Sequence, residues 1–476
     1  MSIQEKPYIL PVHRRLKEPR LNFDPQREGA TDAHPLRGLQ EFGPYGKHKL
    51  AGVIDPVRIA FVGEANMIGR LRDLLNELHR RLTPRERPAY LRNYPGFREL
   101  FGIQLIEAPE QTHIVLPDPL NQRISDAERP HQVLAEALTG AISSLSAQRH
   151  AFDVVMIGLD AKWSAAFEER QDEDFDLHDY VKAIAASSGI SVQFVRSDKA
   201  LSYYCRCSVM WRMAIALYTK AGGEPWGLEG LQPDSAYIGV DYALRPRADK
   251  ESRFAVCCAQ VFDADGVGLD FVAYEANDVK VFHKNPYLRR DQMLKVMARS
   301  LAVYQRKHGG RPPKRVVVHK NTRFLDDEVE GCFDALNIVD NVELIHIQDE
   351  TSWRGFAFSQ ANQPDNYPIL RGTMLPVGPY EALLWTQGDL PEVADGAHYY
   401  KEGKGTPSPL LITRHAGYGD FEDICREILA LTKIDWNNDG PYTRMPVTLS
   451  YAGMLAQIVK RMPKLEPHPY PVRLFM

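Results

Sequence analysis

The stretch YIGVDYAL (237–244) is apolar except for one carboxylate, Asp241, and it opens the run of segments that decides the fold. FAVCCAQVF (254–262) and LDFVAYEA (269–276) follow it and have the β-branched and aromatic content of strands. The turn between these two segments, Asp263-Ala264-Asp265-Gly266, favours a hairpin. The sequence therefore predicts three successive antiparallel strands.

An amphipathic helix is predicted after these strands. Between residues 291 and 306 the apolar side chains recur at helical spacing and form one face: Met293, Val296, Met297, Leu301 and Tyr304. Gly309-Gly310 follows this helix, and RVVVH (315–319) is a further strand. Three strands, a helix and a returning strand are the order of an RNase H-like domain, which we place at residues 234–476.

The preceding residues, 53–233, predict a different α/β domain. Apolar runs that suit buried strands alternate with segments of helical period, and these runs are VRIAFVG (57–63), HIVL (113–116), DVVMIGL (153–159) and SVQFV (191–195). Such alternation is typical of a doubly wound, Rossmann-like parallel sheet. The segment GEANMIG (63–69) lacks the G-x-G-x-x-G spacing of a dinucleotide site. Residues 1–52, rich in proline, glycine and charge, are predicted to be an extended arm or linker.

Composition is typical of a globular protein. The 476 residues are enough for about two to four domains. No apolar run approaches the roughly 18 residues of a membrane span, and the N-terminus lacks the layout of a signal peptide. We therefore expect a cytoplasmic protein with no membrane partner. None of the six cysteines forms a Cys-x2-Cys pair, so we expect reduced, mostly buried thiols and no zinc site.

Positive charge is concentrated in two stretches, although the whole chain carries a net charge of −4. Eight arginines lie between Arg70 and Arg98, and ten lysines or arginines lie between Arg289 and Lys320. Such stretches suit the binding of a phosphate backbone. They suit solvated helix faces equally well, and composition alone leaves both interpretations open.

Several segments resemble landmarks of the Argonaute family, in the family's order. They are EPRLNF (18–23), GLQEFGPYG (38–46), QFV (193–195), YTKAGGEPW (218–226), YIGVDYA (237–243), RVVVHKN (315–321) and MPVTLSYAGMLAQI (445–458). The resemblance covers essentially the whole chain. It implies an α/β protein with a Rossmann-like MID domain followed by an RNase H-like PIWI domain. It leaves no room for the N and PAZ domains of long Argonautes, so it implies the short prokaryotic type.

The resemblance implies a pocket for the 5′ phosphate of a guide at His178, Lys182, Gln193 and Lys220. Residues four apart share a helix face, so His178 and Lys182 can approach one phosphate together. The lysines supply charge, Gln193 supplies an amide donor, and the His178 ring can stack on the first base. The family adds the C-terminal carboxylate, often with a divalent cation, which implies a structural Mg²⁺ held by Gln193 and Met476. Taken singly, each residue is also explained as a surface or packing residue.

The resemblance also locates the cutting centre of active PIWI domains, which needs clustered carboxylates around two metal ions. Asp241 keeps the first ligand position, but Asn321 stands at the second and Gly453 at the fourth. The expected loop glutamate is missing from FHKNPYLRRD (282–291), where Asp291 is the only carboxylate. Since a neutral amide is a weak ligand for magnesium, we expect no cutting and interpret Asp241 as a structural remnant.

These features predict an inactive Argonaute that holds a 5′-phosphorylated guide and senses a complementary target. The resemblance implies an RNA guide, a plasmid or phage DNA target, and a heterodimer with an APAZ-domain partner. That partner carries a sirtuin-like, TIR or nuclease effector, with the sirtuin-like one favoured, and its activation commonly depletes NAD and aborts infection. Two alternatives stay open: a guide-directed endonuclease with an atypical metal site, and a guide-independent nucleic-acid binder.

Overall fold

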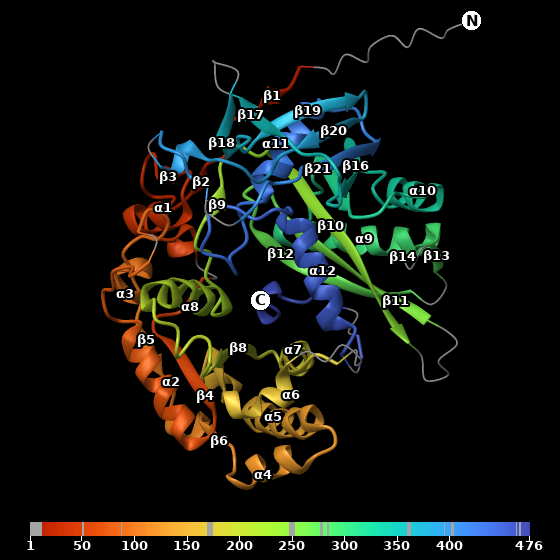
Figure 1. Ribbon diagram of the computed structural model, residues 1–476. Helices are drawn as coiled ribbons and strands as arrows, with labels where there is room; N and C mark the ends of the chain where they lie inside the picture. The colour runs from red at the N-terminus through yellow and green to blue at the C-terminus, as the bar shows by residue number, and fades with distance from the viewer. Residues whose placement is uncertain are drawn as a thin grey trace, which may run out of the picture.

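The computed structural model consists of two α/β lobes, seen below and above the C-terminus in Figure 1. It describes residues 12–49, 52–86, 88–168, 175–246, 253–276, 279–282, 285–358, 363–394, 396–400, 404–462, 464–465 and 468–476. For residues 245–246, 253–258, 269 and 366 only the main chain is described. Within these residues no helix is long and apolar enough to cross a membrane.

The first lobe is built on a parallel sheet, as the alternation of strands and helices predicts. Its strands pair in the order β5-β4-β7-β8, with β6 also beside β4, and every pairing is parallel. The strands are β4 (Val57–Gly63), β5 (Leu105–Glu107), β6 (Ile114–Val115), β7 (Val154–Leu159) and β8 (Ser191–Arg196). The helices are α2 (Ala65–Glu77), α3 (Phe97–Phe101), α4 (Pro119–Asp126), α5 (Pro130–Ser146), α6 (Ser164–Phe167), α7 (Leu177–Ser187) and α8 (Arg206–Lys220).

Both faces of this sheet are covered, which explains why β4 and β7 are continuous apolar runs. Ile59 and Phe61 belong to one buried cluster with α2 and α8, whereas Ala60 and Val62 belong to another with α4 and α5. The prediction of a doubly wound, Rossmann-like domain is confirmed.

The second lobe is a mixed sheet of nine described strands, in the order β1-β19-β20-β21-β16-β15-β10-β11-β12. Its first half in sequence contains the predicted hairpin strands, helix and returning strand: β10 (Ser235–Pro246), β11 (Arg253–Phe262), β12 (Gly268–Ala276), α9 (Arg290–Lys307) and β15 (Arg315–Lys320). β10 pairs antiparallel with β11 and parallel with β15. The remaining strands are β1 (Arg14–Arg15), β16 (Asn341–Gln348), β19 (Thr373–Gly378), β20 (Glu381–Leu384) and β21 (Leu410–Ala416). This arrangement is RNase H-like, as expected.

Helices cover both faces of the mixed sheet. The helices α9 and α10 (Asp326–Ala335) enclose one apolar cluster, and α11 (Phe421–Leu431) and α12 (Val447–Val459) belong to the other. Helix α12 lies so close to β10 that a Cβ atom at Gly239 would sit 1.9 Å from the Thr448 carbonyl oxygen. Only glycine permits this approach, and the approach brings α12 directly over the middle of β10. Two short hairpins, β13 (Lys280–Phe282) with β14 (Asn285–Tyr287) and β17 (Phe356–Phe358) with β18 (Pro364–Pro368), complete the lobe.

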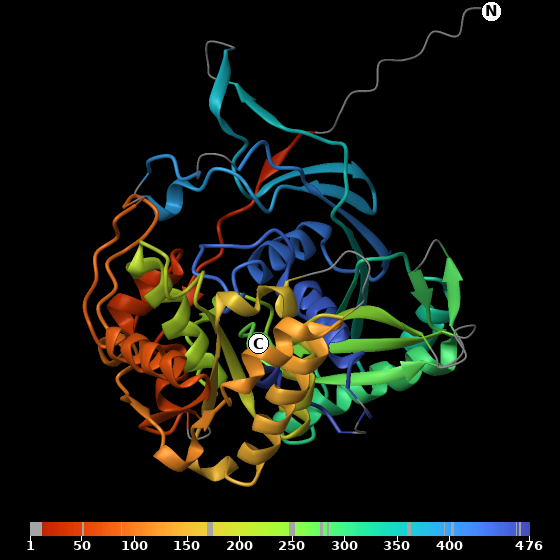
Figure 2. The ribbon, with the colours of Figure 1, turned by 60° about the horizontal axis from the view of Figure 1, so that its bottom comes forward.

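The N-terminal arm is more ordered than its composition predicts. Strand β1 (Arg14–Arg15) joins the mixed sheet beside β19, and β2 (Leu21–Asn22) pairs with β3 (Thr31–Asp32) and β9 (Gly227–Leu228). Helix α1 (Pro35–Phe42) then begins at a His34 cap. The interpretation of residues 1–52 as only an arm or linker is therefore wrong for this part. Its side chains Leu16, Leu21 and Leu36 are buried. Figure 2 shows the segment in red, running from β1 beside the mixed sheet toward α1.

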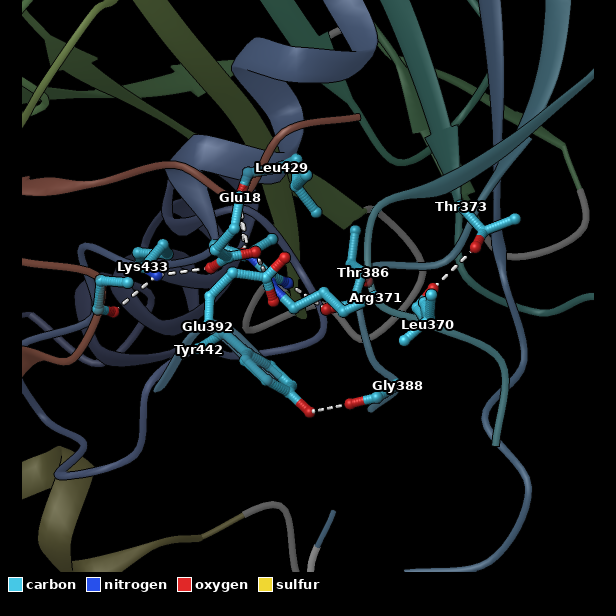
Figure 3. A network of polar contacts seen from close by, with 12 residues as sticks. Glu18, Leu370, Arg371, Thr373, Thr386, Gly388, Glu392, Leu429, Lys433 and Tyr442 are labelled. Carbon is cyan, nitrogen blue, oxygen red and sulfur yellow. Dashed lines mark hydrogen bonds and ion pairs between the residues drawn. The ribbon is translucent and has the colours of Figure 1, made fainter. Parts of the chain in front are cut away.

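A buried polar network anchors the arm to the second lobe (Figure 3). The carboxylate of Glu18 accepts from Arg371 at 2.9 Å and also from the ammonium of Lys433. All three side chains are almost fully buried. Although burial raises it, the charges of Arg371 and Lys433 hold the pKa of Glu18 below its usual value. One carboxylate thus balances two buried cations, which makes Glu18 structurally important.

Candidate functional site

A cavity of about 860 Å³ lies beside β8, α7 and α8 of the first lobe, and Asn437 and Met476 of the second lobe reach it. All five residues of the predicted phosphate pocket line this one cavity: His178, Lys182, Gln193, Lys220 and Met476. These residues are separated by up to 298 positions in the chain, from 178 to 476. The structure therefore brings together every residue that the sequence predicts for the pocket.

Helix α7 places His178 and Lys182 on one side of the cavity. Asp176 caps the helix by accepting from the Asp179 main-chain amide at 2.8 Å, so the first turn is fixed. The Lys182 side chain is buried, at 6% exposure, whereas 51% of the His178 side chain is exposed. The His178 ring lies 4.9 Å from the Phe194 ring, centroid to centroid. One residue thus presents an accessible ring, and the other presents a buried charge.

The two lysines are the most unusual groups of the cavity. Lys182 donates to the Phe475 carbonyl at 3.2 Å, and Lys220 donates to the main-chain oxygen of Met476. Among the described residues, no side-chain carboxylate lies within ion-pair distance of either ammonium. Burial lowers the pKa of Lys182 to about 8, although Asp179 and Asp176 oppose the shift. Burial, reinforced by the charge of Lys182, lowers the pKa of Lys220 well below its usual value.

Gln193 and the rest of the wall complete the cavity. The Gln193 amide nitrogen donates to the Phe194 carbonyl at 3.0 Å, so its second N–H and its amide oxygen are left for other partners. The sequence interpretation missed Tyr203, Tyr204 and Arg212, which also line the cavity. Tyr203 and Tyr204 are exposed aromatic residues at the start of α8. The sequence shows an aromatic pair before a helix with basic residues, but this pattern is too common to indicate a binding site.

The predicted cutting-centre positions also converge, around Asp241 in the middle of β10. Asn321 donates its side-chain amide to Asp241 Oδ1 at 3.1 Å, and the Tyr242 main-chain amide donates to the same oxygen at 2.8 Å. A Cβ atom at Gly453 on α12 would lie 2.7 Å from Asp241 Oδ2. Burial raises the pKa of Asp241. One carboxylate, one amide and one residue without a side chain therefore occupy this point.

Sequence comparison gives one informative relative. No family model matches the chain. A segment of 291 residues, 61% of this chain, is 21% identical to the protein argonaute of Aquifex aeolicus and covers 36% of that protein.

Solved structures match along nearly the whole chain. Clostridium butyricum Argonaute bound to a guide DNA and a 19-mer target DNA matches with a TM-score of 0.66 and 14% identity, over 98% of this chain and 54% of that one. The chain has the fold of an Argonaute. Drosophila Piwi matches with a TM-score of 0.64 and 15% identity, over 97% of this chain and 55% of that one. Aa-Ago with externally bound siRNA matches with a TM-score of 0.61 and 16% identity, over 98% of this chain and 56% of that one. The chain spans about half the length of these Argonaute-fold structures.

Two further carboxylates of the second lobe are paired with lysines. Asp291, the only carboxylate of segment 282–291, is exposed at the start of α9 and pairs with Lys295 at 3.1 Å. Glu328 is fully buried and pairs with Lys320 at 2.6 Å. Asp241 Oδ1 instead accepts from the Tyr242 amide and the Asn321 side chain.

Part of the charge in the two basic stretches is paired with carboxylates of the same chain. In the first, Arg72 pairs with Glu107 and Glu110. In the second, Arg290 pairs with Glu330 and Asp334, and the buried Arg315 pairs with Glu427 at 2.7 Å. Since their charges are already paired, these arginines support the binding of a phosphate backbone less well than the lysines of the cavity do.

Buried thiols agree with the expectation for the cysteines whose side chains are described. Cys205, Cys207, Cys332 and Cys425 are free and buried. The side chains of Cys257 and Cys258 lie outside the described residues.

Proposed function

We propose that this chain is the guide-binding, target-sensing subunit of a prokaryotic defence system, acting in the cytoplasm as a short Argonaute that does not cut. The observation that carries the proposal is the pair of buried lysines, Lys182 and Lys220, in a cavity without a side-chain carboxylate to balance them. Lys220 contacts the α-carboxyl group of Met476, which offers one negative charge to two buried ammonium groups, and a buried ammonium left without an opposite charge is costly. A ligand that brings two negative charges to this point would remove that cost.

A 5′-terminal phosphate fits these requirements best. Its oxygens accept from ammonium groups in charge-assisted hydrogen bonds, and the Gln193 amide offers a further polar contact. His178, with its exposed ring, is placed to stack on the first base. Family resemblance favours an RNA guide and a DNA target, and the matched Clostridium butyricum structure holds a guide DNA and a target DNA. Binding measurements with RNA and DNA guides of one sequence therefore decide between the two.

A structural magnesium ion at Gln193 and Met476 stays a prediction with limited support. The donors are the Gln193 amide oxygen and the α-carboxyl group of Met476, one oxygen of which already accepts from Lys220. Magnesium prefers about six hard oxygen ligands and favours carboxylates, and two ammonium groups line the same cavity. These residues alone fit the ion poorly, so the proposed binding of the phosphate rests on the lysines.

We propose that the chain does not cut, from the residues around Asp241 on β10. Two-metal hydrolysis requires several carboxylates around the ions, and here Asp241 faces Asn321 and Gly453. The alternative is a guide-directed endonuclease with an atypical metal site. Incubating the chain with guide, complementary target and Mg²⁺ or Mn²⁺ decides between them. We expect no specific product; a product that disappears in Asp241→Ala would establish the endonuclease.

The effector is proposed on resemblance alone. We infer a heterodimer with an APAZ-domain partner, sirtuin-like in preference to TIR or nuclease, whose activation by a guide–target duplex consumes NAD and aborts infection by plasmid or phage. Co-expression with the product of the adjacent reading frame, followed by measurement of NAD in cells carrying the target plasmid, tests it. NAD levels that do not respond to the target would contradict this part.

The binding proposal is tested by comparing 5′-phosphorylated and 5′-hydroxyl guides of one sequence. We expect the unmodified chain to prefer the phosphorylated guide by at least tenfold, since one charge-assisted hydrogen bond is worth about 1.5–3 kcal/mol. Lys182→Ala with Lys220→Ala should abolish the preference. Lys295→Ala, at an exposed lysine paired with Asp291, is the matched control. Equal binding of both guides, unaffected by the lysine variants, would favour the guide-independent binder.

A further inference from the structure

A second hollow, of about 390 Å³, lies beside helix α2 of the first lobe and is lined by three arginines, Arg70, Arg80 and Arg206. Arg206 is paired with Glu77 at 2.6 Å. Arg70 and Arg80 are exposed, and within the part of the chain that the structure describes no hydrogen bond or ion pair reaches their guanidinium groups. Two guanidinium groups of the first basic stretch are therefore available to an anion.

This hollow adjoins the cavity that holds the predicted phosphate pocket. Leu201 lines the hollow, whereas the next residues, Ser202 and Tyr203, line the cavity. Residues 81–85 likewise lead from Arg80, at the hollow, to Glu86, at the cavity. The hollow and the cavity thus share one side of the parallel sheet, where α2 and α8 lie (Figure 1).

An aromatic pair stands where the hollow and the cavity meet. Tyr203 and Tyr204 are 41% and 57% exposed, and their ring centroids lie 5.2 Å apart. Both hydroxyl groups donate to the Glu86 carboxylate, which fixes the rings. Exposed rings beside basic side chains are the combination that binds single-stranded nucleic acid, because bases stack on the rings while the cations contact the phosphates.

The carboxylates around this surface oppose an anion only weakly. Glu77 accepts from Arg206 through both oxygens, and Asp198 pairs with Arg196 at 2.6 Å. Asp73 lines the hollow and is exposed, so water and salt screen its charge. The guanidinium groups of Arg70 and Arg80 therefore dominate the solvent side of the hollow.

We propose that Arg70, Arg80, Tyr203 and Tyr204 bind the single-stranded DNA that continues from the target past the 5′ end of the guide. The proposal rests on the proposed function. Paired strands run antiparallel, so a guide whose 5′ phosphate lies at Lys182 brings the 3′ side of its target to this end of the cavity. The guide stops there, whereas a target within a longer DNA continues.

The chemistry of the surface suits such a flank. A guanidinium binds phosphate oxygens in a bidentate contact, and tyrosine rings stack on bases of any sequence. The surface therefore holds the flank without reading its sequence, while base pairing with the guide supplies the specificity. A target that lies within a long DNA should be bound more tightly than an isolated complementary oligonucleotide.

The test compares three targets on the guide-loaded chain: the bare complement, the complement with a 3′ tail and the complement with a 5′ tail. Each tail has about ten nucleotides, within the site sizes of single-strand binding proteins. We expect the 3′ tail to tighten binding about tenfold, as one charge-assisted contact does, and the 5′ tail to give no such gain. Equal effects of the two tails, or no effect of the 3′ tail, would overturn the inference.

Two double variants separate the phosphate contacts from the stacking. Arg70→Ser with Arg80→Ser should remove most of the gain from the 3′ tail and lower its salt dependence by about two phosphate contacts. Tyr203→Leu with Tyr204→Leu should reduce the gain without changing the salt dependence, and an abasic 3′ tail on the unmodified chain should give the same result. Arg70→Lys with Arg80→Lys keeps the charge and should retain part of the gain.

Arg123→Ser is the matched control, because Arg123 is 58% exposed and lies on α4, which packs on the other face of the sheet. This variant should keep the full gain from the 3′ tail. If Arg70→Ser with Arg80→Ser weakens the bare complement as much as the tailed one, the arginines act on the paired segment and the inference is wrong. A chain that does not prefer a 5′-phosphorylated guide contradicts the proposed function, whereas one that prefers it and gains nothing from the 3′ tail contradicts this inference alone.

Discussion

Replacing Lys182 by methionine should make the unliganded protein more stable while it weakens the binding of a guide. Methionine keeps the length of the side chain but removes the charge. The pKa of Lys182 falls from the usual 10.5 to about 8 in the folded chain. Since one pKa unit corresponds to about 1.4 kcal/mol, charged Lys182 destabilises the folded state by roughly 3 kcal/mol at neutral pH.

The lost hydrogen bond to the Phe475 carbonyl offsets part of this gain. A typical intramolecular hydrogen bond contributes about 1 kcal/mol, so Lys182→Met should stabilise the chain by about 2 kcal/mol at pH 7. The destabilisation by the charged lysine is complete below about pH 8. It fades as the pH rises toward 10.5, because the buried amine is then neutral. The difference between variant and unmodified chain should therefore shrink between pH 8 and pH 10.

Urea unfolding at pH 7 and pH 10 measures the stability, and a fluorescent 5′-phosphorylated guide measures the binding. We expect about 10- to 150-fold weaker binding in Lys182→Met, from about 1.5–3 kcal/mol of a charge-assisted hydrogen bond. Lys295→Met, at the exposed lysine paired with Asp291, should change neither quantity appreciably. A Lys182→Met chain that is less stable at pH 7 and binds the guide normally would refute the reasoning, since Lys182 would then be a structural residue.

Four further outcomes are expected. Asn321→Asp alone should leave target DNA uncut in a cleavage assay with Mn²⁺, because Gly453 still offers no ligand and a Cβ atom there would crowd Asp241 at 2.7 Å. Glu18→Ala should lower the free energy of unfolding by about 3–5 kcal/mol, measured in urea, because Arg371 and Lys433 lose their buried partner. Since the pKa of Glu18 is lowered on folding, its contribution to the free energy of unfolding is present above the unfolded pKa and is lost as the pH falls through the folded pKa. Glu18→Gln should therefore be less stable at neutral pH, and its free energy of unfolding should fall less steeply in acid. Adding a chelator should change the affinity for a 5′-phosphorylated guide less than Lys220→Ala does; a larger effect of the chelator would support the predicted magnesium ion.

The sequence by itself determined β4, β6, β7 and β8 of the parallel sheet and β10, β11, β12 and β15 of the mixed sheet. Apolar runs such as VRIAFVG (57–63) and RVVVH (315–319) became buried parallel strands, because a strand covered on both faces has no place for alternating polar residues. The hairpin at residues 263–266 was equally predictable, since its Gly266 has a positive φ of 69°. These features depend on neighbours in the chain, and local patterns report them.

The N-terminal arm could not be predicted in the same way. Strands β1 and β2 have two residues each and form by pairing with β19 and β9, which follow hundreds of residues later in the chain. Such short strands have no period of their own. Their stability comes from partners, as does the burial of Glu18 against Arg371.

The candidate site divides along the same line. The residue types at 178, 182, 193 and 220, together with Asp241, Asn321 and Gly453, could be named from motifs, because the spacing within one helix or after one strand fixes a position. Only the tertiary structure decided that both lysines are buried without a side-chain carboxylate and that a Gly453 Cβ atom would meet Asp241. Burial and distance between remote segments are properties of the packed chain. They set the charge of a site, which no local pattern contains.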